Sequence, residues 1–128
     1  MFMTVSLIWT LGVLAGEGNE AWHCENALEV HCDEQECSVS DDFTPTRVTL
    51  TDRGELTLCA YSGCWSGAAT RAIDDRYVVA LAGGLMRSSP AEDATDRTPA
   101  SLTIDRESGM GTMLGMGFAQ PVNCIYRK

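Results

Sequence analysis

Hydrophobic and polar residues alternate with a period of two over several short segments from residue 46 onward. Such alternation places apolar side chains on one face of a β-strand and polar side chains on the other. The segments 47–51 and 55–59 both alternate, and residues 52–54 (Asp-Arg-Gly) between them have the composition of a turn. The pattern therefore predicts a β-hairpin here.

A second hairpin is predicted further along the chain. The segments 70–73 and 77–81 flank the polar residues 74–76, and the second arm is rich in β-branched and aromatic residues. We expect the Gly83-Gly84 pair that follows to end this strand.

The C-terminal part of the chain predicts a loop and a third hairpin. Residues 88–99 contain two prolines and many small polar residues, which is typical of an exposed loop. The segment 101–104 is expected to pair with 112–119 across a turn at 106–109. Residues 123–126 have the composition of a final short strand.

The fold class follows from these short strands. Residues 22–37 are dense in cysteine and predict irregular structure, in which 27–30 forms a short strand or one helical turn. No segment has the period of a long amphipathic helix. Six to eight short strands at this spacing predict an all-β fold, a small antiparallel barrel or sandwich. With 128 residues, the chain suits a single disulfide-stabilised domain over 16–128.

Residues 1–15 have the composition of a signal peptide. The segment 5–15 is largely apolar with no charged side chain, and Val13-Leu14-Ala15 suits a signal peptidase. A membrane span needs about 20 apolar residues, so this run is short for an anchor. A retained N-terminal anchor is the alternative. After removal of the signal, the domain is expected in the periplasm or outside the cell, without membrane contact.

All six cysteines follow the expected cleavage point, and an even number in an exported chain predicts a disulfide framework. Their positions are Cys24, Cys32, Cys37, Cys59, Cys64 and Cys124. Six cysteines allow 15 connectivities. We expect Cys59 to pair with Cys64, and Cys124 to pair with Cys24.

The net charge of −9 is concentrated near the N-terminus. Nine acidic residues and no Lys or Arg lie within residues 17–42, whereas nine acids balance nine bases from residue 43 onward. This charge excludes nucleic acid as a partner and favours a basic protein or a cation. The candidate partner-binding residues are Glu25, Glu29, Asp33, Glu34 and Glu36, with Trp65 exposed on a disulfide-closed turn. The other interpretation is a solvated acidic stretch that aids solubility.

The alternative chemistry is metal binding. Both histidines, His23 and His31, lie beside a cysteine and an acid in a doubled tripeptide. Imidazoles and carboxylates are ligands for Zn²⁺ or copper, which makes these two histidines the candidate ligands. Met110, Met113 and Met116 also have spacing that suits Cu(I), although core filling is their ordinary role. Otherwise no cofactor is expected.

No catalytic motif is present. Gly63-Cys64-Trp65-Ser66-Gly67 does not have the Gly-x-Ser-x-Gly order of a nucleophile elbow. The five-residue separation of Cys59 and Cys64 also differs from the redox spacing with two intervening residues. We therefore expect a non-catalytic protein that binds a partner or protects the cell envelope.

The arrangement of Trp22-His23-Cys24, the two closely spaced cysteine pairs and the lone Cys124 resembles that of small exported six-cysteine bacterial proteins of unknown function. This resemblance implies no particular activity. A second resemblance is to periplasmic inhibitors of C-type lysozyme, which are small disulfide-bonded β-barrels. Their Ser-Gly loop is echoed by Ser62-Gly63 or Ser66-Gly67, but their cysteine pattern differs, and no inhibitory residue is carried over.

Overall fold

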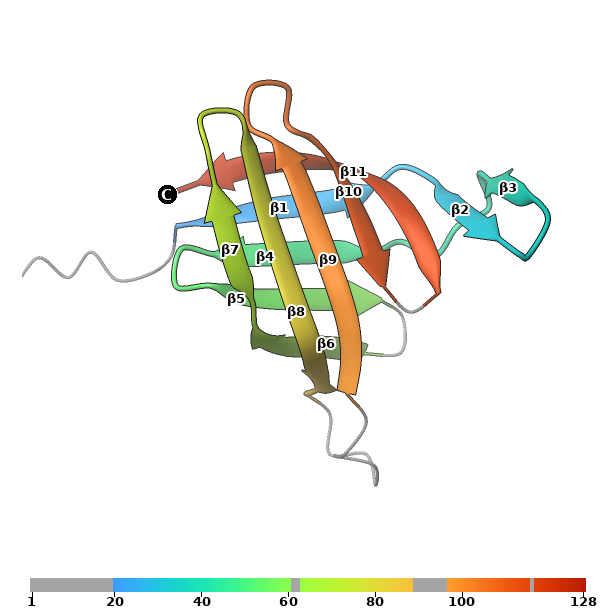
Figure 1. Cartoon of the computed structure of the whole chain (residues 1–128), viewed down its shortest axis with the longest axis horizontal. Coiled ribbons are helices and arrows are strands. Elements are labelled where there is room, and N and C mark those ends of the chain that lie inside the picture. Colours follow the sequence, from blue (N-terminus) through green and yellow to red (C-terminus); the bar gives the residue numbers. More distant parts are fainter. Residues whose placement is uncertain (1–19, 61–62, 89–96, 116) are drawn as a thin grey trace, which may run out of the picture.

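The computed structural model describes residues 20–60, 63–88, 97–115 and 117–128, and this part of the chain is all-β (Figure 1). Eleven strands lie in these described ranges. They are β1 (Ala21–Asn26), β2 (Glu29–Cys32), β3 (Cys37–Ser40), β4 (Arg47–Thr51), β5 (Glu55–Ala60), β6 (Gly63–Ala68), β7 (Thr70–Ile73), β8 (Tyr77–Arg87), β9 (Arg97–Asp105), β10 (Met110–Gly115) and β11 (Phe118–Arg127).

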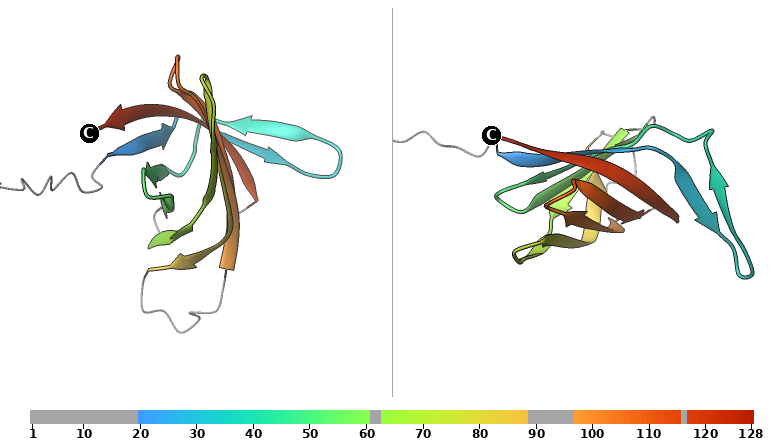
Figure 2. Two further views of the ribbon diagram at one scale, coloured as in Figure 1. Left: turned by 60° about the vertical axis from the view of Figure 1, so that its left-hand side comes forward. Right: turned by 90° about the horizontal axis from the view of Figure 1, so that it is seen from above.

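The strands form a closed antiparallel barrel. Their order is β1-β4-β5-β6-β8-β9-β10-β11, and β1 also pairs with β11, which closes the barrel. β7 follows β6 after Ala69, and both β6 and β7 pair with β8. β6 and β7 therefore share one position in the wall. The barrel therefore has eight positions, and neighbours in the wall follow one another along the chain except where the β2–β3 hairpin intervenes (Figures 1 and 2).

Alternating side chains from every part of the wall fill the barrel. Val48 and Leu50 of β4 and Leu56 and Leu58 of β5 are each 2% exposed or less, which follows directly from their period-two spacing. The full core cluster is Cys24, Val48, Leu50, Leu56, Leu58, Trp65, Val78, Ala80, Ala82, Leu85, Ala100, Leu102, Ile104, Met113, Val122 and Cys124. An interior of this size is filled by side chains, as is usual for eight strands.

Three disulfides join residues that face each other directly in adjacent strands. Cys24–Cys124 connects β1 to β11 inside the barrel, and Cys59–Cys64 connects β5 to β6, so both expected pairings are confirmed. The third bridge, Cys32–Cys37, connects β2 to β3. In all three, the Cα atoms are 4.0 to 4.1 Å apart.

The predicted β-rich fold is confirmed, and it is a barrel rather than a sandwich. The hairpin of β4 and β5 has the predicted bounds to within one residue. β7 also matches its prediction. The expectation that Gly83-Gly84 ends the next strand is wrong, because β8 continues to Arg87 with a register shift between Ala82 and Leu85. A β-bulge accommodates the two glycines without ending the pairing.

Other strand boundaries also need correction. Arg97–Pro99 belong to β9 instead of the predicted loop, and most of that loop (89–96) lies outside the described residues. The single strand predicted over 112–119 is two strands, because the chain turns before Phe118 and β11 then runs to Arg127. The segment 22–37, predicted to be irregular, contains most of β1 and all of β2. The predicted signal peptide lies outside the described residues.

Candidate partner-binding site

The β2–β3 hairpin projects from the barrel beside the wall formed by β10 and β11 (Figures 1 and 2). β11 is long enough to pair with two strands, β1 and then β2, along the same edge. Its second half pairs with β1 as far as Val122, and Ala119 then pairs with Val30 of β2. The chain therefore leaves the closed barrel after β1 and extends the sheet outward before it returns to β4.

Two further contacts fix the foot of the hairpin. The Ala27 backbone N–H donates to the carbonyl oxygen of Pro121 at 3.3 Å. The Gln120 side chain, only 3% exposed, donates through Nε2 to Glu29 Oε1 at 3.1 Å. Since Glu29 accepts this hydrogen bond, it anchors the hairpin to the barrel.

The tip of the hairpin is a locally ordered acidic turn. The Asp33 carboxylate accepts hydrogen bonds from the backbone N–H groups of Gln35 at 2.9 Å and Glu36 at 2.8 Å. These two bonds lower the pKa of Asp33 below its ordinary value of 3.8. The Cys32–Cys37 disulfide closes the same turn. The tip therefore presents the charges of Asp33, Glu34 and Glu36 from a constrained backbone.

The structure brings some of the predicted acidic residues together and separates others. Asp33, Glu34 and Glu36 are exposed at the hairpin tip, and Glu29 is at its foot. Glu25 lies on the outer wall of β1, where it forms an ion pair with Arg47 at 3.5 Å. The acidic N-terminal third is thus divided between the hairpin and the barrel wall.

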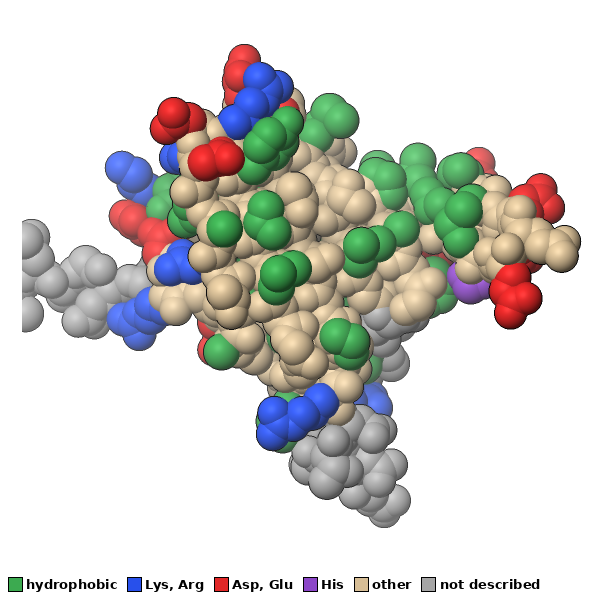
Figure 3. All heavy atoms as spheres, in the orientation of Figure 1, with side chains coloured by type: hydrophobic (Ala, Val, Ile, Leu, Met, Phe, Trp, Pro, Cys, Tyr) green, Lys and Arg blue, Asp and Glu red, His purple; other side chains and the backbone are tan. Residues whose placement is uncertain are grey.

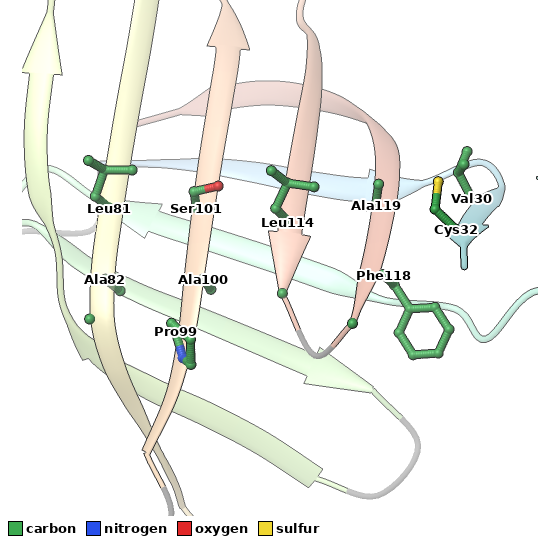
Figure 4. Close-up of a pocket in the computed structure, with 13 residues that line it drawn as sticks. Val30, Cys32, Leu81, Ala82, Pro99, Ala100, Ser101, Leu114, Phe118 and Ala119 are labelled. Atoms are coloured by element: carbon green, nitrogen blue, oxygen red, sulfur yellow. The ribbon is translucent and has the colours of Figure 1, made fainter. Parts of the chain in front are cut away.

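An apolar groove lies at the foot of the hairpin, on the outer face of the barrel (Figure 4). The strand register places Leu81, Ser101, Leu114, Ala119 and Val30 in one row across five neighbouring strands. Phe118 and Cys32 also line the groove, and its volume is about 680 Å³. The groove is therefore continuous from the barrel wall to the hairpin.

The groove is uncharged. None of its described lining residues carries a charge. Two of its leucines are accessible to solvent, since Leu81 is 56% exposed and Leu114 is 51% exposed. Figure 3 shows apolar side chains spread over this face, with acidic and basic side chains at its margins and acids on the projecting hairpin. The acidic tip begins at Asp33, directly after the groove-lining Cys32. An uncharged apolar surface and a negatively charged tip thus adjoin each other.

The expected exposure of Trp65 is wrong. Trp65 is on β6 and only 8% exposed, because its position in the β5–β6 register directs the side chain into the core opposite Leu58. The Arg87 guanidinium lies over its ring, 5.7 Å from the centroid. Trp65 is therefore a core residue. The Ser66 hydroxyl on the same strand lies 3.0 Å from Thr57 Oγ1, while Ser62 lies outside the described residues.

The two histidines are not brought together. His23 is opposite Ile125 on β11, whereas His31 is on β2 with its ring 5.6 Å from that of Phe118, near the start of β11. Val30, the neighbour of His31, pairs with Ala119, and the six residue steps along β11 from Ala119 to Ile125 span about 20 Å. No group of three or more His, Cys, Asp or Glu side chains able to hold a metal occurs in the described part of the chain. Of the three methionines, Met113 is buried in the core, Met110 is exposed, and Met116 lies outside the described residues.

No family model, no curated protein and no solved structure matches the chain. Three disulfides are typical of a protein that folds in an oxidising compartment. The described ranges contain no helix with the length and apolar character required to span a membrane.

The acids of the hairpin are predictable from the sequence, whereas the groove was not predicted. Leu81 and Leu114 occupy outward-facing positions of their strands, where the alternating pattern predicts polar residues. Each is therefore an exception to that pattern. These two outward-facing leucines could have indicated an apolar patch on the outer face. The strand register that aligns them comes only from the folded barrel.

Proposed function

We propose that this chain is an exported, non-catalytic domain that binds a basic protein through the tip of its β2–β3 hairpin. The observation that carries the proposal is the group of three exposed carboxylates on a projecting, disulfide-closed turn. No Lys or Arg occurs within residues 29–40 to neutralise them.

The physical argument concerns both charge and preorganisation. An unpaired group of like charges attracts an oppositely charged surface and accelerates the encounter with it. A backbone already ordered by the disulfide and the Asp33 hydrogen bonds loses little conformational entropy on binding. The hairpin therefore suits recognition of a partner better than an unstructured acidic segment would.

The cellular location forms part of the proposal. The disulfides support folding outside a reducing cytoplasm, and the apolar N-terminal segment supports export. We place the mature protein in the periplasm or outside the cell. A basic protein in either compartment is the class of partner proposed.

The test compares two charge-neutralised variants of the oxidised protein. E34Q/E36Q removes charge from the tip without changing Asp33, which orders the turn. E55Q/D75N removes the same charge from two exposed positions outside the hairpin and serves as the matched control. Binding to hexalysine is measured by fluorescence anisotropy at low and physiological salt. A C-type lysozyme, which is a basic protein, is the second probe.

We expect E34Q/E36Q to weaken hexalysine binding about fivefold at low salt, with a smaller difference at higher salt where charges are screened. E55Q/D75N should bind as the unmodified protein does. If all three proteins bound both probes equally, the proposed role of the hairpin tip in binding would be contradicted. Binding of lysozyme with inhibition of its activity would identify the partner class.

A further inference from the structure

The apolar groove adjoins the acidic tip so closely that one partner segment can occupy both. We propose that the groove receives apolar side chains of a partner segment whose neighbouring Lys or Arg residues contact the hairpin tip. The inference rests on the proposed function and specifies its partner: a segment of another protein with apolar residues followed by basic ones.

The dimensions of the groove suit a short extended segment. Leu81, Ser101, Leu114, Ala119 and Val30 lie on consecutive strands in one row. Adjacent strands are about 4.8 Å apart, so the row extends roughly 19 Å along the surface. An extended pentapeptide has a similar length. Ser101 and Ala119 are the small members of the row, and Leu81 and Leu114 rise beside them (Figure 4).

The electrostatics give the segment a direction. The described residues that line the groove are all uncharged, so apolar groups of a partner can be buried there without leaving a charge unpaired. At the hairpin end, Cys32 lines the groove and Asp33 follows it, about 3.8 Å away between Cα atoms. A Lys or Arg next to a groove-bound residue therefore reaches the carboxylates of the tip.

The charges of this chain favour a different protein over a second copy as the occupant. The sequence has 18 acids and nine bases. Several of those bases already have partners within the fold: Arg47 pairs with Glu25, Arg76 with Asp105 and Glu107, and Arg106 with the carbonyl of Asp74. A second copy has the same net charge of −9, so on balance the acidic tip repels it.

The experiment uses three blocked pentapeptides and isothermal titration calorimetry with the oxidised protein. Leu-Phe-Leu-Lys-Lys carries both features, Leu-Phe-Leu-Ser-Ser lacks the charge, and Ser-Ser-Ser-Lys-Lys lacks the apolar part. L81S/L114S makes the groove polar, and both side chains are already half exposed, so the core is left intact. I125S is the matched control, because Ile125 is 51% exposed on another part of the wall.

We expect L81S/L114S to weaken binding of Leu-Phe-Leu-Lys-Lys about tenfold, because the two serines bury less apolar surface against the peptide than the leucines do. I125S should have no effect, and Ser-Ser-Ser-Lys-Lys should bind L81S/L114S and I125S equally.

If E34Q/E36Q weakens the binding of Leu-Phe-Leu-Lys-Lys while L81S/L114S does not, the groove inference fails and the hairpin function stands. If neither variant weakens it, or it does not bind, both fail. A dimer in sedimentation that L81S/L114S dissociates would assign the groove to a second copy and overturn the inference.

Discussion

Asp74 and Asp33 show how a single aspartate orders a turn in this protein. The Asp74 carboxylate, at the turn between β7 and β8, accepts from the backbone N–H of Tyr77 at 2.6 Å and of Arg76 at 2.7 Å. These bonds lower the pKa of Asp74 below 3.8. Asp33 makes the same two contacts with the second and third residues after it. Turn-forming aspartates of this kind are recognisable in a sequence because their partners are local.

The lowered pKa of Asp74 gives a pH-dependent prediction. Because the folded pKa is below 3.8, the ionised carboxylate stabilises the fold above pH 3.8, and the contribution is lost as the pH falls through the folded value. D74A should therefore reduce the free energy of unfolding near neutral pH. The difference from the unmodified protein should shrink as the pH falls below 3.8, as measured by urea unfolding across that range. A difference independent of pH would contradict the role of the charge.

At the scale of elements, the three disulfides differ in what they stabilise. Cys24–Cys124 joins the first and last barrel strands across a sequence separation of 100 residues and lies in the core. Cys32–Cys37 closes a separation of five residues in a hairpin that contributes no side chain to that core cluster. The first bridge should therefore stabilise the whole barrel, and the second only the hairpin.

Removal of each bridge tests this difference. C24A/C124A should lower the free energy of unfolding by about 4 kcal/mol, because the unfolded chain regains the freedom of a long loop. C32A/C37A should lower it by less than about 1 kcal/mol, because the hairpin is outside the cooperative core. Chemical denaturation monitored by Trp fluorescence measures both. An equal loss in the two variants would mean that the hairpin unfolds with the barrel.

Elements with clear alternation and local turn chemistry could be predicted from the sequence, and β4, β5 and β7 were. β6 was missed because its residues, Gly63–Ala68, are small and turn-like, and its strand conformation depends on pairing with β5. The boundary between β10 and β11 was missed because both flanks are apolar. At Gly83-Gly84 the long pairing of β8 with β9 overrode a local turn signal.

At the scale of the whole molecule, the hairpin is the part of the sheet that barrel closure leaves outside. β1 and β11 seal the wall, which removes the sheet edges there, while β2 and β3 extend from β11 beyond the seam. The acids on this extension were visible in the sequence because they are close together in the chain. The groove was not visible, because it is assembled from β8, β9, β10, β11 and β2.

Chemical-shift mapping of the labelled, oxidised protein with Leu-Phe-Leu-Lys-Lys shows whether the hairpin tip and the groove form one binding surface. We expect the largest changes at the Leu81 and Leu114 methyl groups and at the Glu34 and Glu36 amides, with Ile125 unchanged. Changes centred on the β1 wall around His23 and Ile125, or no localised changes at all, would contradict this expectation.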